Sequence, residues 1–433
     1  MPPSNPNLEH SNVGGSHSPA TRAAIRSHFP ALGRGTVFFD NAGGSQLPRC
    51  AIDAAVACMT DGFAQLGGEY GPSLLARQIV GLAHDVVLAY LNAGAVGEVV
   101  LGSSTTSLVN LIASAYADGS RERNQIVLCS ANHEGNLSPW LRLASRGFEI
   151  RWWHAEQEPS EDARTVIYRP RIETLRGLLS DRTLLVAFPQ VSNILGEVWD
   201  ARGVAAAAHA VGAKVIVDGV AYAPHFAPDV AALGCDWYVY STYKVYGPHM
   251  AALFGTHGAW AELCGPNHGF IDRADTRKKW ELGGASHEGC AAIGALWDYC
   301  AWLAGAPGSG VPTREVFERA FSVIAELERP LTERMLSYLR SRPGVTIYGP
   351  SGASPARVCT VCFTVRGKRS EEIARAANAA GLGVRFGHFY SKRLIEQMGL
   401  EPEDGVVRVS LAHYNTPEEL DMLFAFLENY GKR

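Results

Sequence analysis

Lys244 and Asp218 are the two residues whose types and positions suggest a specific chemistry. Residues 214–218 read KVIVD, a short apolar strand that ends on Asp218. Lys244 lies in the run STYKVYGPH, directly after a second apolar stretch, DWYVYS. An amine that forms a Schiff base with an aldehyde, and an acid that keeps a pyridine nitrogen protonated, are what pyridoxal 5'-phosphate (PLP) requires. The sequence therefore predicts a PLP site in which both residues are catalytic and bind the cofactor.

Two further polar segments follow apolar strands. In GSSTTSLVN (102–110), Thr105 and Thr106 would present hydroxyls and helix N-terminal amides to an anion such as a phosphate. In SANHEGNLSPW (130–140), the flat imidazole of His133 could stack on a planar cofactor and take part in proton transfer. Taken singly, each has a structural alternative: a helix cap without a ligand, and a histidine that only supports the fold.

An amide and a guanidinium complete the set. Asn193, in PQVSNILGE (189–197), could hydrogen-bond the phenolic oxygen of the cofactor, although a turn residue is the alternative. Arg408 interrupts the apolar run VVRVSL, and its planar fork suits the α-carboxylate of an amino acid. An edge-strand arginine facing water is the alternative there. No metal ligands are predicted.

These residues can form one site only in a fold that brings the carboxyl ends of several strands together. From residue 74 to 254, helical stretches alternate with short apolar strands, which indicates an α/β fold with a large, mainly parallel sheet covered by helices on both faces. Ligands of such sheets bind at the carboxyl ends of the strands. We expect a flexible N-terminal lead-in (1–22), a large PLP-binding domain (23–295) and a small C-terminal α+β domain (296–433).

Composition limits the class of partner. The chain has 433 residues, of which 47% are hydrophobic and 19% charged, with a net charge of −4. This balance does not favour nucleic acid or an anionic membrane surface, and no apolar run suggests a transmembrane helix or a secretory signal. Nine scattered cysteines favour reduced thiols in the cytoplasm. Cys359 and Cys362 form a C-x-x-C pair inside the β-like run RVCTVCFTV, where positions three apart point to opposite faces.

Together the segments resemble the class V aminotransferase-like group of fold-type I PLP enzymes, in particular the cysteine desulfurase branch. The resemblance runs from FFDNAGG (38–44) to the C-terminal helix and includes STTSLVN, NHEGNLSPW, VSNILG, VDGVAYAPH, STYKVYGP and RVSLAHYNT. It implies roles for seven residues: Lys244 carries the cofactor, Asp218 faces the pyridine nitrogen, His133 stacks on the ring, Asn193 meets the phenolic oxygen, Thr106 and Ser241 hold the phosphate, and Arg408 binds the substrate carboxylate. It also implies a homodimer in which ELGGASHE (281–288) reaches the partner.

The chain departs from that family at functional positions. Desulfurases carry a nucleophilic cysteine on a loop where this chain reads VRFGHFYSKR, and the aligned residue is Tyr390. A phenol cannot accept sulfur as a persulfide, because that step needs a thiolate. Tyr243 replaces the usual histidine before the lysine, Ala221 replaces a glutamine, and Gly284 replaces a threonine. We therefore expect Tyr243 near the cofactor, Tyr390 near the substrate, and a thiol-less subgroup.

The resulting hypothesis is a PLP-dependent enzyme that acts on a small α-amino acid. Without a thiol acceptor we favour lyase chemistry at Cβ, either C–S elimination or β-decarboxylation with aldol-type C–C bond formation. An aminotransferase or epimerase is the alternative for the same site. The alternative that is not an enzyme is a PLP-binding protein that has lost catalysis and serves as a partner of another protein.

Overall fold

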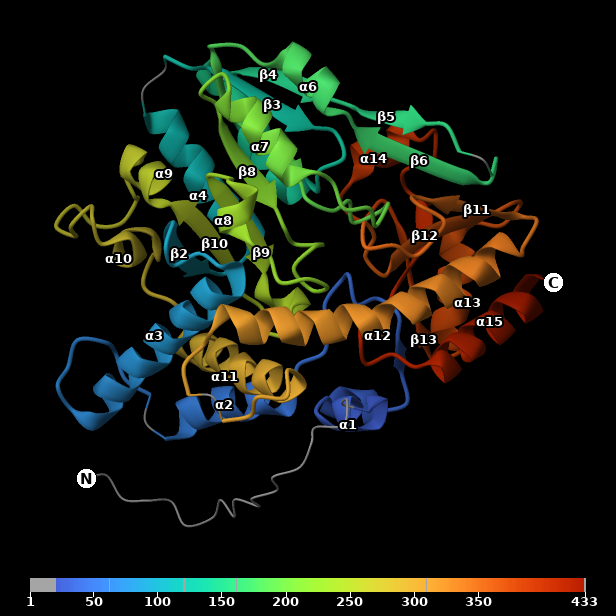
Figure 1. Ribbon diagram of the computed structural model, residues 1–433, viewed down its shortest axis with the longest axis horizontal. Coiled ribbons are helices and arrows are strands. Elements are labelled where there is room, and N and C mark those ends of the chain that lie inside the picture. The colour runs from blue at the N-terminus through green and yellow to red at the C-terminus, as the bar shows by residue number, and fades with distance from the viewer. Residues whose placement is uncertain (1–20, 62, 120–121, 161, 309, 432–433) are drawn as a thin grey trace.

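The protein is described by a computed structural model that covers residues 21–61, 63–119, 122–160, 162–308 and 310–431. It contains a large sheet and a smaller one, with helices around both (Figure 1). Most of the predicted lead-in, residues 1–20, lies outside the described residues. The lead-in does not extend to residue 22 as predicted, because α1 (Arg22–Ser27) already begins there and Thr21 caps it by accepting from the Ala24 N–H.

The large sheet has seven strands, and only β10 runs antiparallel to its neighbours. The predicted α/β class with a mainly parallel sheet is confirmed. The spatial order is β2 (Gly97–Gly102), β10 (Ala251–Thr256), β9 (Trp237–Ser241), β8 (Lys214–Asp218), β7 (Thr183–Pro189), β3 (Gln125–Cys129) and β4 (Glu149–Trp153).

Both faces of this sheet are buried, which explains why its strands are almost continuously apolar. In β8, Val215 and Val217 contribute to one hydrophobic cluster and Ile216 to the other. Leu108 and Ile112 of α4 cover the Ile216 side, whereas α3, α7 and α11 contribute to the opposite cluster. The helices of this region are α2 (Arg49–Thr60), α3 (Gly71–Leu91), α4 (Thr105–Asp118), α5 (Ser138–Leu141), α6 (Ile172–Leu178), α7 (Ala201–His209), α8 (Val230–Leu233), α9 (His257–Glu262), α10 (Thr276–Trp280) and α11 (His287–Leu303).

One described helix, α3, is long and apolar enough to cross a membrane by length and composition alone, which the sequence analysis did not predict. Its most apolar stretch has a mean hydropathy of 1.4 and is 39% buried inside the protein. A single helix of this kind is a weak indication, because core helices pass the same test. In the fold, α3 packs along α11 beside the large sheet (Figure 1).

The smaller sheet mixes segments from both predicted domains. Its order is β14 (Arg385–Gly387), β15 (Val406–Ser410), β12 (Thr360–Val365), β11 (Val345–Tyr348), β6 (Thr165–Pro170) and β5 (Ala155–Glu158). A short parallel pair joins β1 (Val37–Phe38) to β13 (Leu382–Gly383). The proposed domain boundary at 295/296 falls inside α11, which packs on α2 and α3. The chain thus contributes residues 37–38 and 155–170 to the C-terminal part.

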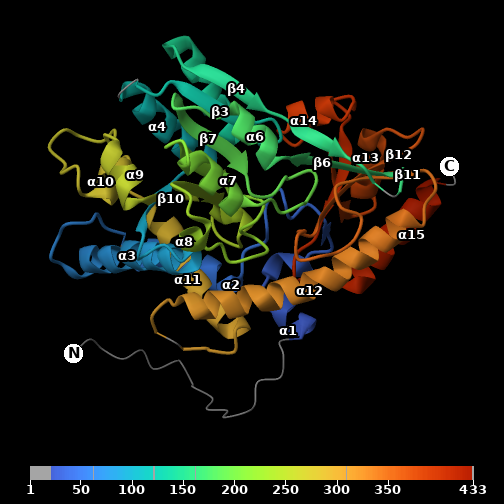
Figure 2. The same ribbon diagram turned by 45° about the horizontal axis from the view of Figure 1, so that its top comes forward.

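Helix α12 (Arg314–Arg340) connects the two parts (Figure 2). Phe317 and Ile324, in its first half, join the core of the large part, whereas Leu331 and Leu336, in its second half, join the core of the small sheet. Pro330 lies between the two halves and removes one N–H from the helical ladder. The remaining helices are α13 (Ser370–Ala379), α14 (Lys392–Gln397) and α15 (Pro417–Gly431).

Candidate active site

The carboxyl ends of neighbouring parallel strands bring Asp218 and Lys244 into one pocket. Asp218 is the last residue of β8, and Lys244 lies in a 3₁₀ turn (Thr242–Lys244) directly after β9. Most of the predicted site residues line this pocket: Thr105, Thr106, His133, Asn193, Asp218, Ser241, Tyr243 and Lys244.

Lys244 is an amine that loses its proton readily. Burial and, next, the guanidinium of Arg408 lower the pKa of Lys244 to about 8, against the opposing effect of Asp218. Near neutral pH much more of this amine is therefore uncharged than of an ordinary lysine, and only the uncharged amine attacks an aldehyde. The environment of Lys244 thus matches the predicted chemistry.

Asp218 is a buried carboxyl group facing the same space. Burial raises the pKa of Asp218, while the Val220 N–H, which donates to Oδ1 at 2.9 Å, and the charge of Lys244 lower it. A cationic ring nitrogen nearby would favour the ionised form. Gly219 must follow Asp218, because an added Cβ would lie 2.0 Å from the Tyr238 hydroxyl. Any larger residue directly after Asp218 would therefore clash with Tyr238.

The N-terminus of α4 forms the predicted phosphate end. Ser104 caps the helix in a capping box with Ser107, so Thr105 and Thr106 are its first two residues. The Thr105 hydroxyl lies 2.8 Å from the Ser241 hydroxyl, which gathers two hydroxyls at the helix end. A Cβ on Gly135 would come within 2.9 Å of the Thr106 Oγ1. A glycine at this position therefore lets the two segments lie close together on this side of the pocket.

His133 is neutral at physiological pH. Burial and, to a lesser extent, the charges of Lys244 and Arg408 lower the pKa of His133 to about 3. Its Nδ1 accepts from the Gly135 N–H at 3.0 Å, which leaves Nε2 to carry the proton. The ring lies 5.2 Å from the ring of Tyr390. A neutral imidazole with a fixed tautomer can stack on a flat ring and donate from Nε2.

Tyr243 stacks on a histidine that the sequence analysis left without a role. The rings of Tyr243 and His249 are parallel, with centroids 4.4 Å apart. His249 lines both this pocket and a larger adjoining one, which Gly284 and its neighbours also line. The only sequence signal for His249 is its place after Gly247-Pro248 in the lysine segment.

Asn193 contacts the loop that carries Tyr390. Its Nδ2 donates to the Phe389 carbonyl at 2.9 Å, and its Oδ1 accepts from the Ser391 hydroxyl at 2.7 Å. The backbone N–H of Glu134 also donates to the Tyr390 carbonyl at 2.8 Å. Phe389 and Tyr390 both have positive φ angles, of 48° and 60°, which is unusual for side chains of this size. Asn193 thus fixes a strained loop, and its contact with the phenolic oxygen stays a prediction.

Arg408 and Tyr390 do not line the pocket itself. Arg408 is almost fully buried on β15, donates to Asp40 Oδ1 at 2.9 Å, and lies 3.8 Å from the centre of the Phe389 ring. Tyr390 is 60% exposed. The roles of Asp40 and Phe389 were not predicted, because each acts through a contact between segments far apart in the chain.

The pocket fits PLP on its own features. It offers an amine of lowered pKa, a buried carboxyl group, paired hydroxyls at a helix N-terminus, and the Gly135 side where a Cβ would intrude. Lys244 would hold the aldehyde carbon, Asp218 the ring nitrogen, and Thr105, Thr106 and Ser241 the phosphate. These assignments remain predictions for each residue.

Comparison with known proteins agrees with this geometry. The family model "Aminotransferase class-V" matches residues 37–259 and 311–423. The chain is 38% identical over 414 residues to the aminotransferase-like protein FGM3 of Gibberella zeae, covering 93% of this chain and 97% of that protein. It is 30% identical to a cysteine desulfurase of Klebsiella pneumoniae, covering 94% and 98%.

A solved structure shows the same fold. The apo structure of a cysteine desulfurase from Thermococcus onnurineus matches with a TM-score of 0.80 and 22% identity, covering 95% of this chain and 98% of that one. Class V aminotransferases and cysteine desulfurases use PLP. The chain therefore belongs to the class V aminotransferase family, in its cysteine desulfurase-like branch, and is a PLP-dependent enzyme that acts on amino acids.

Proposed function

We propose that this enzyme carries out lyase chemistry at Cβ of a small α-amino acid and forms no persulfide on the protein. One observation carries the proposal: the loop position that would accept sulfur holds Tyr390, and no cysteine lines the pocket within the described residues. Sulfur transfer to the protein needs a thiolate within reach of the substrate. A phenol at this position cannot supply one.

Cys362 does not substitute for the missing thiol. It lies on β12 opposite Arg408 in the sheet register and is fully buried. Burial raises the pKa of Cys362 to about 12, against the lowering effect of Arg408, so the group stays a protonated thiol. Its position inside a paired strand also denies it the movement that a sulfur carrier needs.

The remaining residues divide the reaction between them. PLP, when bound, supplies an electron sink that stabilises negative charge at Cα. Lys244 Nζ, with a pKa of about 8, is suited to remove the Cα proton and return it. The buried Nε of Arg408 has no partner among the described residues, and a substrate α-carboxylate would satisfy it.

A second arginine favours a substrate with another acidic group. Arg385 on β14 is the direct register partner of Arg408 on β15, so the two side chains share one face of the sheet. Arg385 is half exposed, lies 3.4 Å from Asp40 Oδ2, and contributes to the lowered pKa of Lys244. A β-carboxylate, as in aspartate, suits this second cation.

Product analysis tests the proposal. The holoenzyme would be incubated separately with cysteine, cystine and aspartate. Elimination should give pyruvate and ammonia with sulfur released in a small molecule, whereas β-decarboxylation should release CO₂ and a Cβ nucleophile trapped by a proton or an added aldehyde. Alanine from cysteine together with a persulfide mapped to any cysteine would contradict the proposal. A keto acid with aminated cofactor would identify an aminotransferase instead.

We also propose that the enzyme works as a cytoplasmic homodimer. The larger pocket beside the site is lined by residues 282–288, the segment expected to reach the partner, and it shares His249 with the cofactor pocket. Apolar side chains of α2 and α3 are exposed, and so is Phe63 in the connection between these helices, which also lines this pocket. Nine cysteines without a disulfide suit a reducing compartment.

A further inference from the structure

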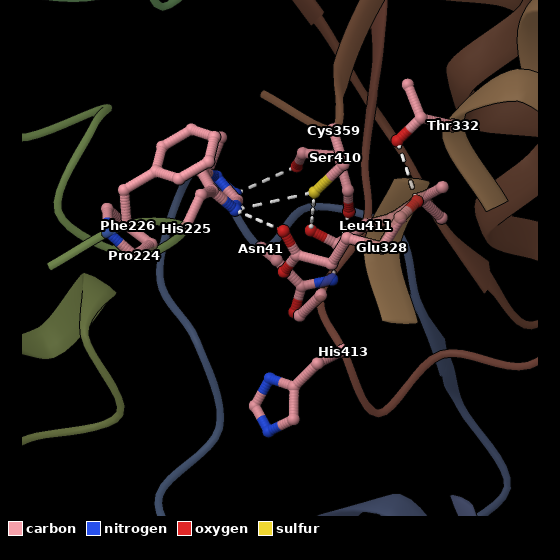
Figure 3. Close-up of polar contacts among 12 residues, drawn as sticks. Asn41, Pro224, His225, Phe226, Glu328, Thr332, Cys359, Ser410, Leu411 and His413 are labelled. Carbon is pink, nitrogen blue, oxygen red and sulfur yellow. Dashed lines mark hydrogen bonds and ion pairs between the residues drawn. The ribbon is translucent and has the colours of Figure 1, made fainter. Parts of the chain in front are cut away.

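His225, Glu328 and Cys359 converge from three distant segments into one buried cluster (Figure 3). Their ligating atoms all lie within 4.8 Å of one another. His225 Nδ1 is 2.9 Å from Glu328 Oε2 and 3.5 Å from Cys359 Sγ. None of the three residues lines the cofactor pocket, so the PLP chemistry does not account for the cluster.

A hydrogen bond between His225 and Glu328 leaves part of this cluster unsatisfied. The bond uses only one carboxylate oxygen, and Oε1 of Glu328 is buried with no partner among the described residues. Glu328 is only 4% exposed, so bulk solvent does not reach it freely. An unpartnered buried oxygen of a carboxylate is destabilising, because it has lost its hydrogen bonds to water and gained none in return. The cluster therefore lacks one positively charged or hydrogen-bond-donating partner among the described residues.

Nearby groups do not fill that place. The imidazole of His413 lies beside the cluster in Figure 3, but its two nitrogens contact the hydroxyls of Tyr246 and Tyr299. Arg22 is close enough for its charge to interact with Glu328, yet its guanidinium donates to backbone carbonyls. Neither group therefore supplies a partner for Oε1 of Glu328.

We propose that His225, Glu328 and Cys359 bind one Zn²⁺-like divalent transition-metal ion. Imidazole, carboxylate and thiolate are the three ligand types that zinc takes in proteins. A divalent ion with one thiolate, one carboxylate and a neutral imidazole is electrically neutral overall, which suits a buried site. The Leu411 carbonyl oxygen, 2.7 Å from Cys359 Sγ, or a water would complete a four-coordinate shell.

Metal binding would also change the protonation state of Cys359. Burial and the charge of Glu328 raise the pKa of Cys359 well above its ordinary value, so without an ion the group is a thiol. A coordinated thiol is deprotonated by the metal, and the proton is released on binding. For His225 Nδ1 to coordinate as well, the proton that it shares with Glu328 must move to Nε2, which keeps the imidazole neutral and leaves the carboxylate free to bind the ion.

The site would join three parts of the fold. His225 follows Asp218 in the loop after β8, Glu328 lies at the middle of α12, and Cys359 directly precedes β12 of the small sheet. An ion held by all three would fix α12 and the small sheet against the loop that begins at the ring-nitrogen acid. Its role would be structural, because no ligand reaches the cofactor pocket.

Metal content of the purified holoenzyme tests the proposal. The protein would be produced with zinc in the medium, dialysed, and analysed for metals and PLP per chain. We expect about one metal ion per chain in the wild type and in Cys362→Ser, and a loss of the ion in Cys359→Ser and His225→Gln. Cys362 is the matched control, since it is a buried cysteine three residues further along the chain, on β12, that belongs to a different core cluster.

X-ray absorption at the zinc edge provides a test that needs no variant. The wild type should show a single sulfur ligand at about 2.3 Å with nitrogen or oxygen ligands at about 2.0–2.2 Å. Cobalt-substituted protein should show the visible bands of a tetrahedral site. A wild-type chain without metal, a bound metal without a sulfur ligand, or a metal that persists in Cys359→Ser would each overturn the proposal.

Discussion

Asp40 is the hydrogen-bond partner of one nitrogen of the Arg408 guanidinium, whereas a second nitrogen of the same group has no partner among the described residues. The terminal nitrogen of Arg408 donates to Asp40 Oδ1 at 2.9 Å, while Nε is buried without a partner among the described residues. Asp40 follows β1 near the start of the chain, and Arg408 lies on β15 near its end. The pair orients a guanidinium whose free donor can serve a substrate carboxylate.

Replacing Arg408 should therefore weaken substrate binding. A hydrogen bond to a charged group contributes about 1.5–3 kcal/mol, so Arg408→Ala should raise KM on the order of 10- to 100-fold. Arg408→Lys should lie in between, because an ammonium keeps the charge and loses the fork. Steady-state kinetics with bound PLP quantified in each variant would measure this. An unchanged KM would mean that Arg408 only supports the fold.

Arg385 provides the contrast with Arg408. Because Arg385 is half exposed, its ion pair with a substrate is screened, and Arg385→Ala should raise KM only about two- to fivefold. If Arg385 meets a β-carboxylate, the increase should occur with aspartate and not with cysteine. Equal increases of KM for both substrates would instead mean that Arg385 contributes only positive charge near the site and does not contact a β-carboxylate.

Asp218→Asn should keep the cofactor and lose most of the rate. A neutral amide cannot hold the ring nitrogen protonated, and loss of one such interaction commonly costs on the order of 10²-fold in kcat. Asp200→Asn is a suitable control, since Asp200 caps α7 at its exposed end and asparagine caps a helix equally well. Turnover in Asp218→Asn close to that of Asp200→Asn would remove the proposed role.

The pKa of Lys244 gives a prediction with a definite sign. Because the pKa of Lys244 is lowered to about 8, the rate at which apoenzyme captures PLP should rise with pH and level off above about 8, rather than near the ordinary value for lysine. Arg408 lowers this pKa and Asp218 raises it, so Arg408→Ala should move the midpoint up and Asp218→Asn should move it down. Stopped-flow absorbance would follow the capture, and borohydride trapping should label the Lys244 peptide.

The sequence predicted the strand ends well because burial on both faces leaves a readable apolar run. KVIVD and DWYVYS became β8 and β9 with Asp218 and Lys244 at their carboxyl ends. Phe389 and Asp40 could not be predicted, since their contacts with Arg408 depend on how a loop and an N-terminal segment pack. The predicted domain boundary at 295/296 differs from the observed packing for a related reason.

That boundary was placed by a change in local pattern, whereas the packing of a helix is decided by distant partners. The predicted boundary at 295/296 divides helix α11, whose residues on both sides belong to one helix that packs on α2 and α3. The hairpin β5–β6 lies within the alternating region of the sequence and nevertheless joins the small sheet through β11. The cluster of His225, Glu328 and Cys359 is invisible in the sequence for the same reason.

The last prediction concerns the exposed apolar surface of α2. Met59 on α2 is 54% exposed and lies among other exposed apolar side chains, including Val56 and Phe63, whereas Met422 on α15 is 52% exposed in a different part of the fold. If a second copy covers α2, Met59→Glu places a charge in an apolar interface and should dissociate the dimer, while Met422→Glu should leave it intact. Sedimentation at several protein concentrations would measure both. A wild-type monomer, or equal behaviour of the two variants, would contradict an interface at α2, because the two methionines differ in location and hardly in exposure.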